Sequence, residues 1–573
     1  MDIKKVFILG VSLINMLFLA AQDSLPLNYF RSPLDIPLYL SGNFGELRSN
    51  HFHSGLDIKT QGVEGQKVYA VADGFVSRIR ISPYGYGNAI YIDHPNGYTS
   101  VYAHLQKYEG KIAEEIKKYQ YKNKTWEMDY YPPDTLLKIK KGQHIALSGN
   151  SGGSGGPHLH FEIRETKSEH PINPLLLGFD VKDEVHPNIR NIVIYPLSDS
   201  SLVNNKNIPQ HIRVVGNSGN QNLISSTLNF AYGPIGIGID VIDQLTGVPN
   251  KNGVYEVKLF VNNEEIFYSK INKFSFDESR AINALLDYKE YLATNQRIQR
   301  SFILENNPLS IYKNSKNKGV FFVDYDKIYD VKYEIYDVYQ NKTTLSFQIA
   351  GMKNRITPFV KKPIKVDTLL SYSDSNFYEN KFVQLSIPKN ALYENLPFQF
   401  AVLDTMYGAI TPTYQLHKEN VPLHYPITVA IKVGRLTENL RQKAVIINID
   451  GSKRYYSKGG EWRNNYLVAT SKTFGGFAVM IDTIPPKITP ISIYPNKIMT
   501  NQKAIQFSIA DNLSGIKTYN AYIDEKWVLL EFDGKTAKLT YYFDGVAKGN
   551  HTFKLEVTDG VENMQTTEIP FIR

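Results

Sequence analysis

The chain has 573 residues, far more than one hydrophobic core can serve, so several domains are expected. Its apolar fraction of 42% and charged fraction of 21% are near the globular average, whereas 39 Tyr and 29 Phe favour strands and predict a mostly β protein. The absence of cysteine excludes disulfides and a lipid-bearing N-terminal Cys. A formal charge of +8 suits an anionic cell envelope, and no nucleic-acid partner is expected.

The first residues have the pattern of a signal peptide. Lys4 and Lys5 precede an apolar run over residues 6–21 that ends in two alanines. The alternative is an uncleaved membrane anchor, but a span needs about 20 apolar residues, and this run is shorter and contains polar side chains. We therefore predict that residues 1–21 are removed and that the protein is exported to the periplasm or the extracellular space, with no stable membrane span after cleavage.

Residues 40–165 contain short β segments separated by glycine, which is typical of one compact β domain. The pattern lapses near residues 108–135, where a charged stretch has partial helical spacing. We interpret this stretch as an insertion with a helix at the rim of the domain. The first domain is accordingly placed at residues 22–178.

A weak internal repeat lies farther along the chain. Residues 239–248 resemble residues 507–516, and residues 333–341 resemble residues 555–563. Each copy has a strand with a D-x-x-x-G turn and a later strand that ends in D-x-x-x-N. Acidic residues at these positions could bind calcium, but turn chemistry explains them without a metal and is the preferred interpretation. The four residues are Asp243, Asp337, Asp511 and Asp559.

The repeat and the period-two strands between its copies predict three further domains. We expect residues 179–362 to form an immunoglobulin-like β sandwich with a helical insertion, residues 363–484 a β sandwich, and residues 485–573 a second immunoglobulin-like sandwich. A Pro-Pro pair at residues 485–486 is a natural linker. These C-terminal sandwiches are candidate surfaces for envelope protein partners.

Histidine is concentrated in the first domain. Seven of the 13 histidines fall within residues 51–160, and three short strings hold the most suggestive of them. These strings are HSGLD at 53–57, YAHL at 102–105 and GNSGGSGGPHLHFE at 149–162. Such clustering indicates a metal site or a proton-transfer site.

His158 and His160 are two residues apart in what is expected to be a strand, so both project from one face with Cα atoms about 6.8 Å apart. A pair of exposed strand histidines is the alternative. In HSGLD, Gly55 favours a turn that aims His53 and Asp57 at one point. An imidazole and a carboxylate suit zinc, and a catalytic zinc site needs three protein ligands and an open position.

His104 in YAHL adds a further histidine, for which a half-buried strand residue is the alternative. His51, His94 and His144 have no comparable partners and are assigned to structure or surface. The residues alone thus supply five candidates for a three-ligand site, and their spacing does not choose between them.

The three strings occur in the order H-x-x-x-D, A-H-L and G-x-S-G-G-P-H-L-H-F-E, and this combination resembles the lysostaphin-type zinc metallopeptidases, which cut peptide bonds in peptidoglycan. The strings GNFGELR at 42–48 and VYAVADGFV at 68–76 agree with it. The resemblance covers about residues 40–165, less than a quarter of the chain. It implies a β-rich lysostaphin-type core, a duplicated hybrid motif, around a groove.

The resemblance implies that His53, Asp57 and His160 bind Zn²⁺ and that His104 and His158 are catalytic. One of the two would accept a proton from the attacking water, and the other would stabilise the oxyanion or protonate the leaving amine. The implied protein is a zinc metalloendopeptidase that hydrolyses peptide cross-links or stem peptides of peptidoglycan. The alternatives are a secreted zinc endopeptidase for glycine-rich proteins and a non-catalytic envelope scaffold or activator that binds peptidoglycan.

Overall fold

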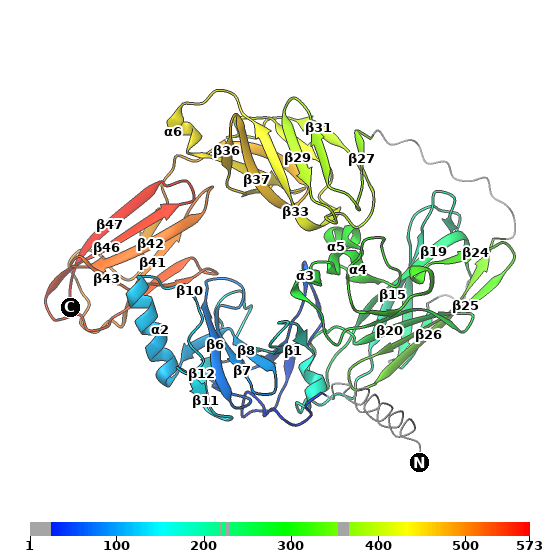
Figure 1. Cartoon of the computed structure of the whole chain (residues 1–573), viewed down its shortest axis with the longest axis horizontal. Coiled ribbons are helices and arrows are strands. Elements are labelled where there is room, and N and C mark those ends of the chain that lie inside the picture. The colour runs from blue at the N-terminus through cyan, green and yellow to red at the C-terminus, as the bar shows by residue number, and fades with distance from the viewer. Residues whose placement is uncertain (1–24, 218, 225–227, 353–365) are drawn as a thin grey trace, which may run out of the picture.

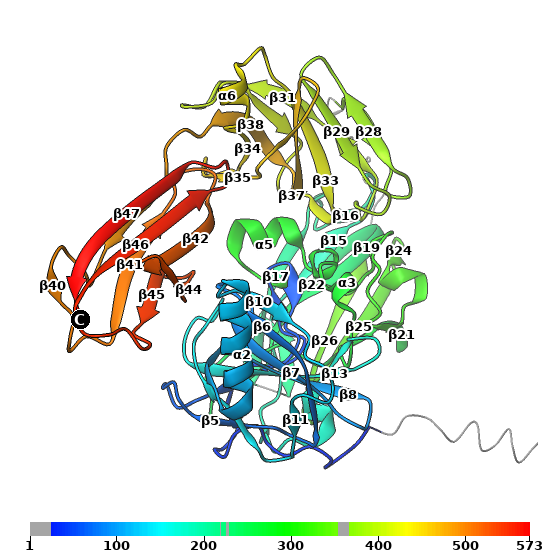
Figure 2. The same cartoon turned by 60° about the vertical axis from the view of Figure 1, so that its left-hand side comes forward.

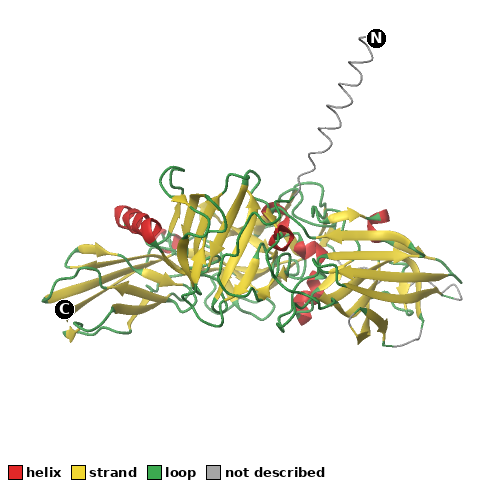
Figure 3. Ribbon diagram, turned by 90° about the horizontal axis from the view of Figure 1, so that it is seen from below, coloured by secondary structure: helices red, strands yellow, loops and turns green. Residues whose placement is uncertain are grey.

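The structure is a computed structural model that describes residues 25–573 except 218, 225–227 and 353–365. Strands make up about 48% of it and helices about 8%, which confirms the prediction of a mostly β protein with several sheet domains (Figure 3). The expected signal peptide and the boundary at 362–363 lie outside the described residues. Within the described part, no helix has the length and apolar character needed to cross a membrane.

The N-terminal domain holds a nine-stranded sheet of order β1-β4-β13-β8-β7-β6-β10, with β11 and β14 beside it, and a three-stranded sheet β5-β12-β9. A single helix, α2, occupies the stretch that the sequence marks as an insertion. The elements are β1 (Leu40–Gly42), β2 (Leu47–Arg48), β3 (His51–Phe52), β4 (Leu56–Lys59), β5 (Lys67–Tyr69), β6 (Gly74–Ile81), β7 (Asn88–Asp93), β8 (Tyr98–Ala103), β9 (Leu105–Tyr108), α2 (Gly110–Asn123), β10 (Met128–Tyr130), β11 (Lys138–Ile139), β12 (His144–Ser148), β13 (His158–Glu165), β14 (Pro171–Ile172) and the 3-10 helix η1 (Pro174–Leu177).

The second domain is a twelve-stranded sheet that folds over one apolar core, because the long strands β17 and β19 take part in both of its halves. Three short helices, α3 to α5, follow β21. The elements are β15 (Asn188–Pro196), β16 (Leu202–Val203), β17 (Gln210–Asn217), β18 (Asn220–Leu223), β19 (Asn229–Ile242), β20 (Glu256–Val261), β21 (Glu264–Lys270), α3 (Phe276–Ser279), α4 (Ile282–Leu285), α5 (Tyr288–Thr294), β22 (Ile298–Arg300), β23 (Tyr312–Asn314), η2 (Lys316–Gly319), β24 (Phe321–Val323), β25 (Ile328–Tyr336) and β26 (Lys342–Gly351).

The third domain packs two five-stranded antiparallel sheets on a common core. Alternation along its strands places one apolar face of each sheet inward. The elements are β27 (Thr368–Leu370), β28 (Asn376–Glu379), β29 (Val383–Ile387), β30 (Leu396–Phe398), β31 (Phe400–Leu403), β32 (Thr413–Leu416), β33 (Pro422–Lys432), α6 (Glu438–Arg441), β34 (Ala444–Ile449), β35 (Tyr455–Ser457), β36 (Glu461–Arg463), β37 (Tyr466–Thr473) and β38 (Gly475–Ile481).

The fourth domain packs a four-stranded sheet against a five-stranded sheet. Its elements are β39 (Lys487–Pro490), β40 (Lys497–Ile498), β41 (Ala504–Ala510), β42 (Ile516–Ile523), β43 (Lys526–Val528), β44 (Glu531–Asp533), β45 (Lys538–Tyr542), β46 (Asn550–Asp559) and β47 (Met564–Ile572).

The four domains follow an arc that brings the fourth domain back to the side of α2 (Figures 1 and 2). Lys117 of α2 forms an ion pair with Asp544, with 2.5 Å between Nζ and Oδ2. Tyr121 of the same helix meets Trp527 edge to face, with ring centroids 5.6 Å apart. The N-terminal and fourth domains are therefore in contact.

The core of the N-terminal domain continues into the second domain. Phe274 is 1% exposed, and its ring packs on Phe44 and Phe52 with centroids 5.1 and 5.3 Å away. Ile271 and the buried face of α4 belong to the same apolar cluster. Residues 22–178 therefore do not enclose their own core, and the segment after β21 completes it.

This shared core makes the N-terminal domain sensitive to a residue outside it. We predict that Phe274→Ala lowers the free energy of unfolding of the N-terminal domain by about 3 to 5 kcal/mol, the usual cost of truncating a buried Phe. Calorimetry and hydrogen exchange of the β3 and β4 amides would measure this. Phe377→Ala, which truncates a 61% exposed ring, is the control and should change little. Unchanged protection of β4 in Phe274→Ala would contradict the shared core.

Candidate metal centre

Strand pairing brings Asp57 and His160 together. Strand β4 runs antiparallel to β13, and in this register Asp57 is directly opposite His160. The turn before β4 lies so close to β13 that a Cβ atom at Gly55 would be 2.3 Å from the carbonyl oxygen of Phe161. Only glycine fits there, and the tight turn holds His53 beside the pair.

Alternation along β13 separates its apolar side chains from its polar ones. Leu159, Phe161 and Ile163 are completely buried in the apolar core. The alternate residues project from the other face of the sheet, on the same side as Asp57 of the neighbouring strand β4. Those residues are His158, His160, Glu162 and Arg164.

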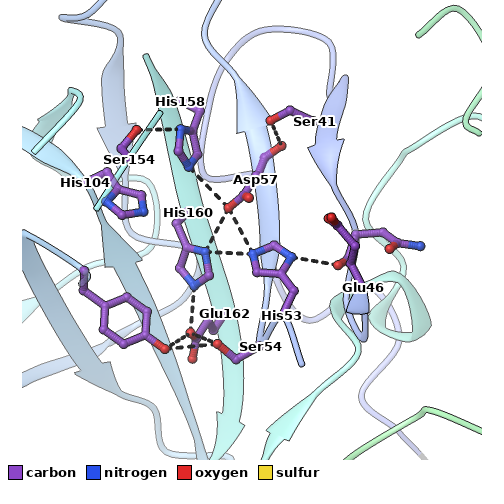
Figure 4. Close-up of polar contacts among 12 residues, drawn as sticks. Ser41, Glu46, His53, Ser54, Asp57, His104, Ser154, His158, His160 and Glu162 are labelled. Atoms are coloured by element: carbon purple, nitrogen blue, oxygen red, sulfur yellow. Dashed lines mark hydrogen bonds and ion pairs between the residues drawn. The ribbon is translucent and has the colours of Figure 1, made fainter. Parts of the chain in front are cut away.

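Three donor atoms converge at one point on this polar face (Figure 4). The Nε2 atom of His53 is 3.0 Å from Oδ1 of Asp57 and 3.0 Å from Nδ1 of His160, and the last two atoms are 2.9 Å apart. A tetrahedral zinc ion with bonds of about 2.0 to 2.1 Å spaces its ligand atoms about 3.3 Å apart. The three residues are 2% to 6% exposed. They therefore fit a metal ion with only a small outward movement.

With a metal ion bound, each imidazole would present its unprotonated nitrogen to this point, because its other nitrogen has an acceptor elsewhere. Nδ1 of His53 donates to the carbonyl oxygen of Asn43 at 2.7 Å. Nε2 of His160 donates to Oε1 of Glu162 at 2.7 Å. Arg48 binds the second carboxylate oxygen of Asp57 at 2.5 Å, which leaves Oδ1 for the centre.

Glu162 is completely buried and is held by several donors. Arg164 Nε, Ser54 Oγ and the Tyr86 hydroxyl each donate to its carboxylate at 2.6 Å. These contacts outweigh burial, so the pKa of Glu162 lies well below its usual value. The carboxylate is therefore ionised and fixed, and it fixes the His160 ring in turn.

The electrostatics of the centre favour a cation between the three donors. Burial lowers the pKa of His53 to about 4, so that ring is neutral at pH 7. Burial opposes a charge on His160, but hydrogen bonds to Asp57 and Glu162 raise its pKa to about 9. The pKa of Asp57 is held well below its usual value by the surrounding histidines, despite its burial. Without a metal ion, a proton on His160 supplies the positive charge that the carboxylates of Asp57 and Glu162 favour. A bound metal ion would supply that charge instead.

His104 and His158 stand beside the three donors with ring centroids 4.7 Å apart. Nδ1 of His104 donates to the Ser151 carbonyl at 2.8 Å, and Nδ1 of His158 donates to the Gly156 carbonyl at 2.8 Å. Nε2 of His104 is left as an acceptor, whereas Nε2 of His158 lies 3.3 Å from Oδ1 of Asp57. Burial and the neighbouring histidines lower the pKa of His104 to about 3. Its backbone is left-handed, with φ of 57°, a conformation that is uncommon outside glycine.

A groove of about 640 Å³ lies over the centre. Asp57, His104 and His158 line it, whereas the other two donor residues do not. One wall is the glycine-rich loop over residues 153–157. Added Cβ atoms at Gly155 and Gly156 would meet nothing within 4 Å, so this part of the loop borders open space. An extended peptide can therefore approach the backbone there.

Other domains also reach the groove. Asn250 of the second domain lines it. Lys535 of the fourth domain donates to the carbonyl oxygens of Asn150 and Ser154 in the glycine-rich loop. The hydroxyl of Ser154 is in turn 3.1 Å from Nδ1 of His158. The surroundings of the centre are thus built from three domains.

The five candidate residues from the sequence lie together, and the other three histidines of the cluster do not. His51 is exposed, His94 bonds to Asp73 and Ser100, and His144 bonds to the Ala146 carbonyl. The supporting residues were not anticipated. Glu162 could have been found, because it is two residues after His160 on the same strand face. Tyr86 comes from a loop before β7 and has no sequence signal.

Two imidazoles and one carboxylate around a single point could hold one metal ion, and two more histidines stand beside them, an arrangement of the kind that hydrolytic metal sites use. The family described as Peptidase family M23 matches residues 51–121 and 135–174, and this part of the chain belongs to that family. The gap between the two matched segments contains the end of α2, the loop that follows it and β10. A second family, described as a Zu5-like domain, matches residues 367–482.

The chain is similar to several curated proteins through this segment. It is 34% identical to the peptidoglycan DD-endopeptidase ShyA of Vibrio cholerae over 25% of this chain and 28% of that protein. It is also 34% identical to the murein hydrolase activator NlpD of Salmonella typhimurium over 27% of this chain and 34% of that protein. The chain thus spans about a third or less of these relatives.

Among solved structures, the catalytic domain of lysostaphin from Staphylococcus simulans is 26% identical. The match covers 23% of this chain and 86% of that one, with a TM-score of 0.18. A zinc-containing peptidase from Vibrio cholerae is 27% identical over 27% of this chain and 40% of that one, with a TM-score of 0.20.

The support that Glu162 gives to His160 can be tested by removing its charge. We predict that Glu162→Gln weakens Zn²⁺ binding about 10- to 100-fold, because the His160 ring loses an anionic acceptor and Arg164 loses its buried partner. Titration with a competing chelator would measure the dissociation constant. The matched control is Glu165→Gln on the same strand, whose partially exposed side chain pairs with Lys273, and it should leave zinc affinity unchanged. Equal affinities in the two variants would remove Glu162 from the centre.

Proposed function

We propose that the protein is a zinc-dependent endopeptidase that hydrolyses amide bonds in the peptide part of peptidoglycan. One observation carries the proposal. The segment that matches Peptidase family M23 keeps three converging donors, His53, Asp57 and His160, beneath a groove that His104 and His158 face.

The donor set favours zinc over other common metals. Two neutral imidazoles and one carboxylate are ligands that zinc accepts, whereas calcium and magnesium prefer oxygen alone. Three protein ligands leave one position open, as hydrolysis requires. A zinc ion held there would supply Lewis acidity, which activates water and polarises the scissile carbonyl.

The two groove histidines are proposed to move protons. Both donate Nδ1–H to backbone carbonyls, and the low pKa of His104 keeps its ring neutral at pH 7, so His104 presents an unprotonated Nε2 atom. One ring accepts the proton of the attacking water at Nε2. The other stabilises the oxyanion or delivers a proton to the leaving amine. Each such contribution is worth about 10² to 10⁴ in rate.

The substrate class rests on the relatives and on the sequence pattern. ShyA is named as a peptidoglycan DD-endopeptidase, and the protein Mpg of Neisseria meningitidis as a DD-carboxypeptidase/endopeptidase. The apolar N-terminal run and the basic charge of +8 suit an exported protein that acts in the cell envelope. We therefore favour direct peptide cross-links as substrate, with the glycan strands left intact.

The non-catalytic alternative has one observation in its favour, the similarity to a murein hydrolase activator. An activator needs a groove but not a metal. The complete donor set, with both groove histidines present, favours catalysis instead. A zinc endopeptidase for glycine-rich proteins keeps the same chemistry and differs only in substrate.

Substitutions of the proposed ligands and of the two groove histidines should have different effects on zinc content and turnover. We predict that His160→Ala loses zinc, because two ligands remain, whereas His104→Ala and His158→Ala keep stoichiometric zinc and lose about 10²-fold or more of their turnover. Elemental analysis and hydrolysis of a soluble cross-linked muropeptide would measure both quantities. His144→Ala is the control for loss of an imidazole away from the centre. A His104 variant with undiminished turnover would exclude that residue from the mechanism.

The bond that is cut should be an amide. Digestion of purified sacculi with the full-length protein should reduce cross-linked dimers, raise monomers and release new free amines, while His158→Ala under the same conditions releases none. Muropeptide mass spectrometry and amine labelling would follow the products. New reducing sugar ends with unchanged cross-linking would show that the proposed substrate is wrong.

A further inference from the structure

A second cluster of possible ligands lies where the N-terminal and second domains meet. Asp183 is in the segment between η1 and β15, Asp243 directly follows β19, and Asp337 directly follows β25. One carboxylate oxygen from each lies within 4.8 Å of the others. Two oxygens bound to the same calcium ion can be at most about 5 Å apart, since each bond is about 2.3 to 2.6 Å. The three carboxylates are therefore within reach of one ion.

Turn chemistry accounts for only part of this cluster. Asp337 accepts hydrogen bonds from the backbone N–H and side-chain amide of Asn341, at 2.9 and 2.7 Å. Oδ1 of Asp183 accepts from the Val185 N–H at 3.0 Å. Oδ1 of Asp243 and Oδ2 of Asp183 are buried and have no partner, and the Asp243 residue is only 2% exposed. The turn interpretation leaves these oxygens unexplained.

Neutral polar groups around the cluster lack partners as well. Asn252 is 3% exposed, and neither atom of its side-chain amide is hydrogen bonded. Its backbone pairs with that of Asp243 in both directions, so the two side chains project from the same side of the pair. The buried hydroxyl of Tyr339 also has no partner. In the described part of the chain, five of twelve such orphaned atoms belong to these four residues.

Three of these five orphaned atoms belong to residues that line one small cavity. The three carboxylates and Tyr339 line it, and its volume of about 10 Å³ has room for one ion or one water molecule. Burial and the nearby carboxylates raise the pKa of Asp243 to about 9, and burial raises that of Asp183 to about 7. Three carboxylates packed this closely repel one another when ionised, and a cation in the cavity removes that repulsion.

We propose that Asp183, Asp243 and Asp337 bind one calcium ion at the junction of the N-terminal and second domains. An all-oxygen set with three carboxylates and neighbouring amide and hydroxyl oxygens suits a hard cation of flexible geometry, which excludes zinc and favours calcium over magnesium. This site is separate from the proposed peptidase centre and does not depend on the proposed function.

A second cluster of three aspartates lies at the junction of the third and fourth domains. Asp482, Asp511 and Asp559 also bring one oxygen each within 4.8 Å. Asn563 donates to the backbone oxygen of Asp482 at 3.0 Å, as Asn341 does to that of Asp183 at 3.2 Å. The sequence repeat contains only the two turn aspartates of each copy, for which turn chemistry is the preferred interpretation. In each copy an Asp from the preceding interdomain segment joins the two turn residues.

A bound ion would order a contact that leads to the metal centre. The side-chain amide of Asn43 exchanges two hydrogen bonds, of 2.8 and 3.0 Å, with the backbone of Gly253, next to Asn252. Asn43 also lines the calcium cavity, and its carbonyl accepts the hydrogen bond that orients His53. The junction and the centre thus share one residue.

Calcium uptake by the full-length protein tests the proposal. Protein stripped of metal and reloaded with zinc is titrated with Ca²⁺ by calorimetry in excess Mg²⁺. The wild type should bind one equivalent more than Asp243→Asn, and saturating Ca²⁺ should raise its Tm by about 5 °C or more. Asp330→Asn, which alters an exposed carboxylate of the same domain, is the matched control and should bind like the wild type.

A spectroscopic measurement keeps the proposal testable if Asp243→Asn fails to fold. Tb³⁺ occupies calcium sites and is excited by a nearby tyrosine, so bound Tb³⁺ should emit in the wild type, lose its emission to added Ca²⁺, and emit more weakly in Tyr339→Phe. No calcium uptake by the wild type at millimolar concentration would overturn the proposal. Undiminished uptake by a folded Asp243→Asn, or terbium emission that is independent of Tyr339, would overturn it as well.

Discussion

The antiparallel pairing of β4 with β13 is the interaction on which the metal centre depends. It places Asp57 opposite His160 and sends the apolar side chains of both strands into one core. A shift of one residue in this register would turn every polar side chain of β13 into that core. The register that gives the domain its hydrophobic core therefore also assembles the donors, so folding and site formation are one event.

Burying so many polar groups on one strand face is costly unless each is satisfied. Here each polar group has a hydrogen-bond partner. Arg164 binds Glu162, Glu162 binds His160, and the backbone of Asn43 binds His53 on the other side. Arg48 neutralises the carboxylate of Asp57 from outside. The donors are preorganised by these contacts, and little rotamer freedom is left for a metal ion to remove.

Local rules point to candidate residues for the centre, and only the family resemblance divides them into ligands and catalytic residues. His158 and His160 follow strand periodicity, and Gly55 marks the turn that joins His53 to Asp57. The residues that support these side chains are harder to predict from the sequence, since Tyr86 reaches Glu162 through tertiary folding alone. The same limit explains two other gaps. No local pattern links Phe274 to the N-terminal core, and none links Asp183 to two turn residues that lie far along the chain.

The contact of Lys535 with the glycine-rich loop links the fourth domain to the position of His158. Lys535 binds the backbone of Ser154, whose hydroxyl touches the imidazole. Coupling free energies are reciprocal, so any effect of displacing the fourth domain on the energy of occupying the groove equals the effect of a groove occupant on the energy of that displacement. A displacement of the fourth domain that breaks the Lys535 contact would release Ser154, and with it one of the two hydrogen-bond partners of Nδ1 of His158.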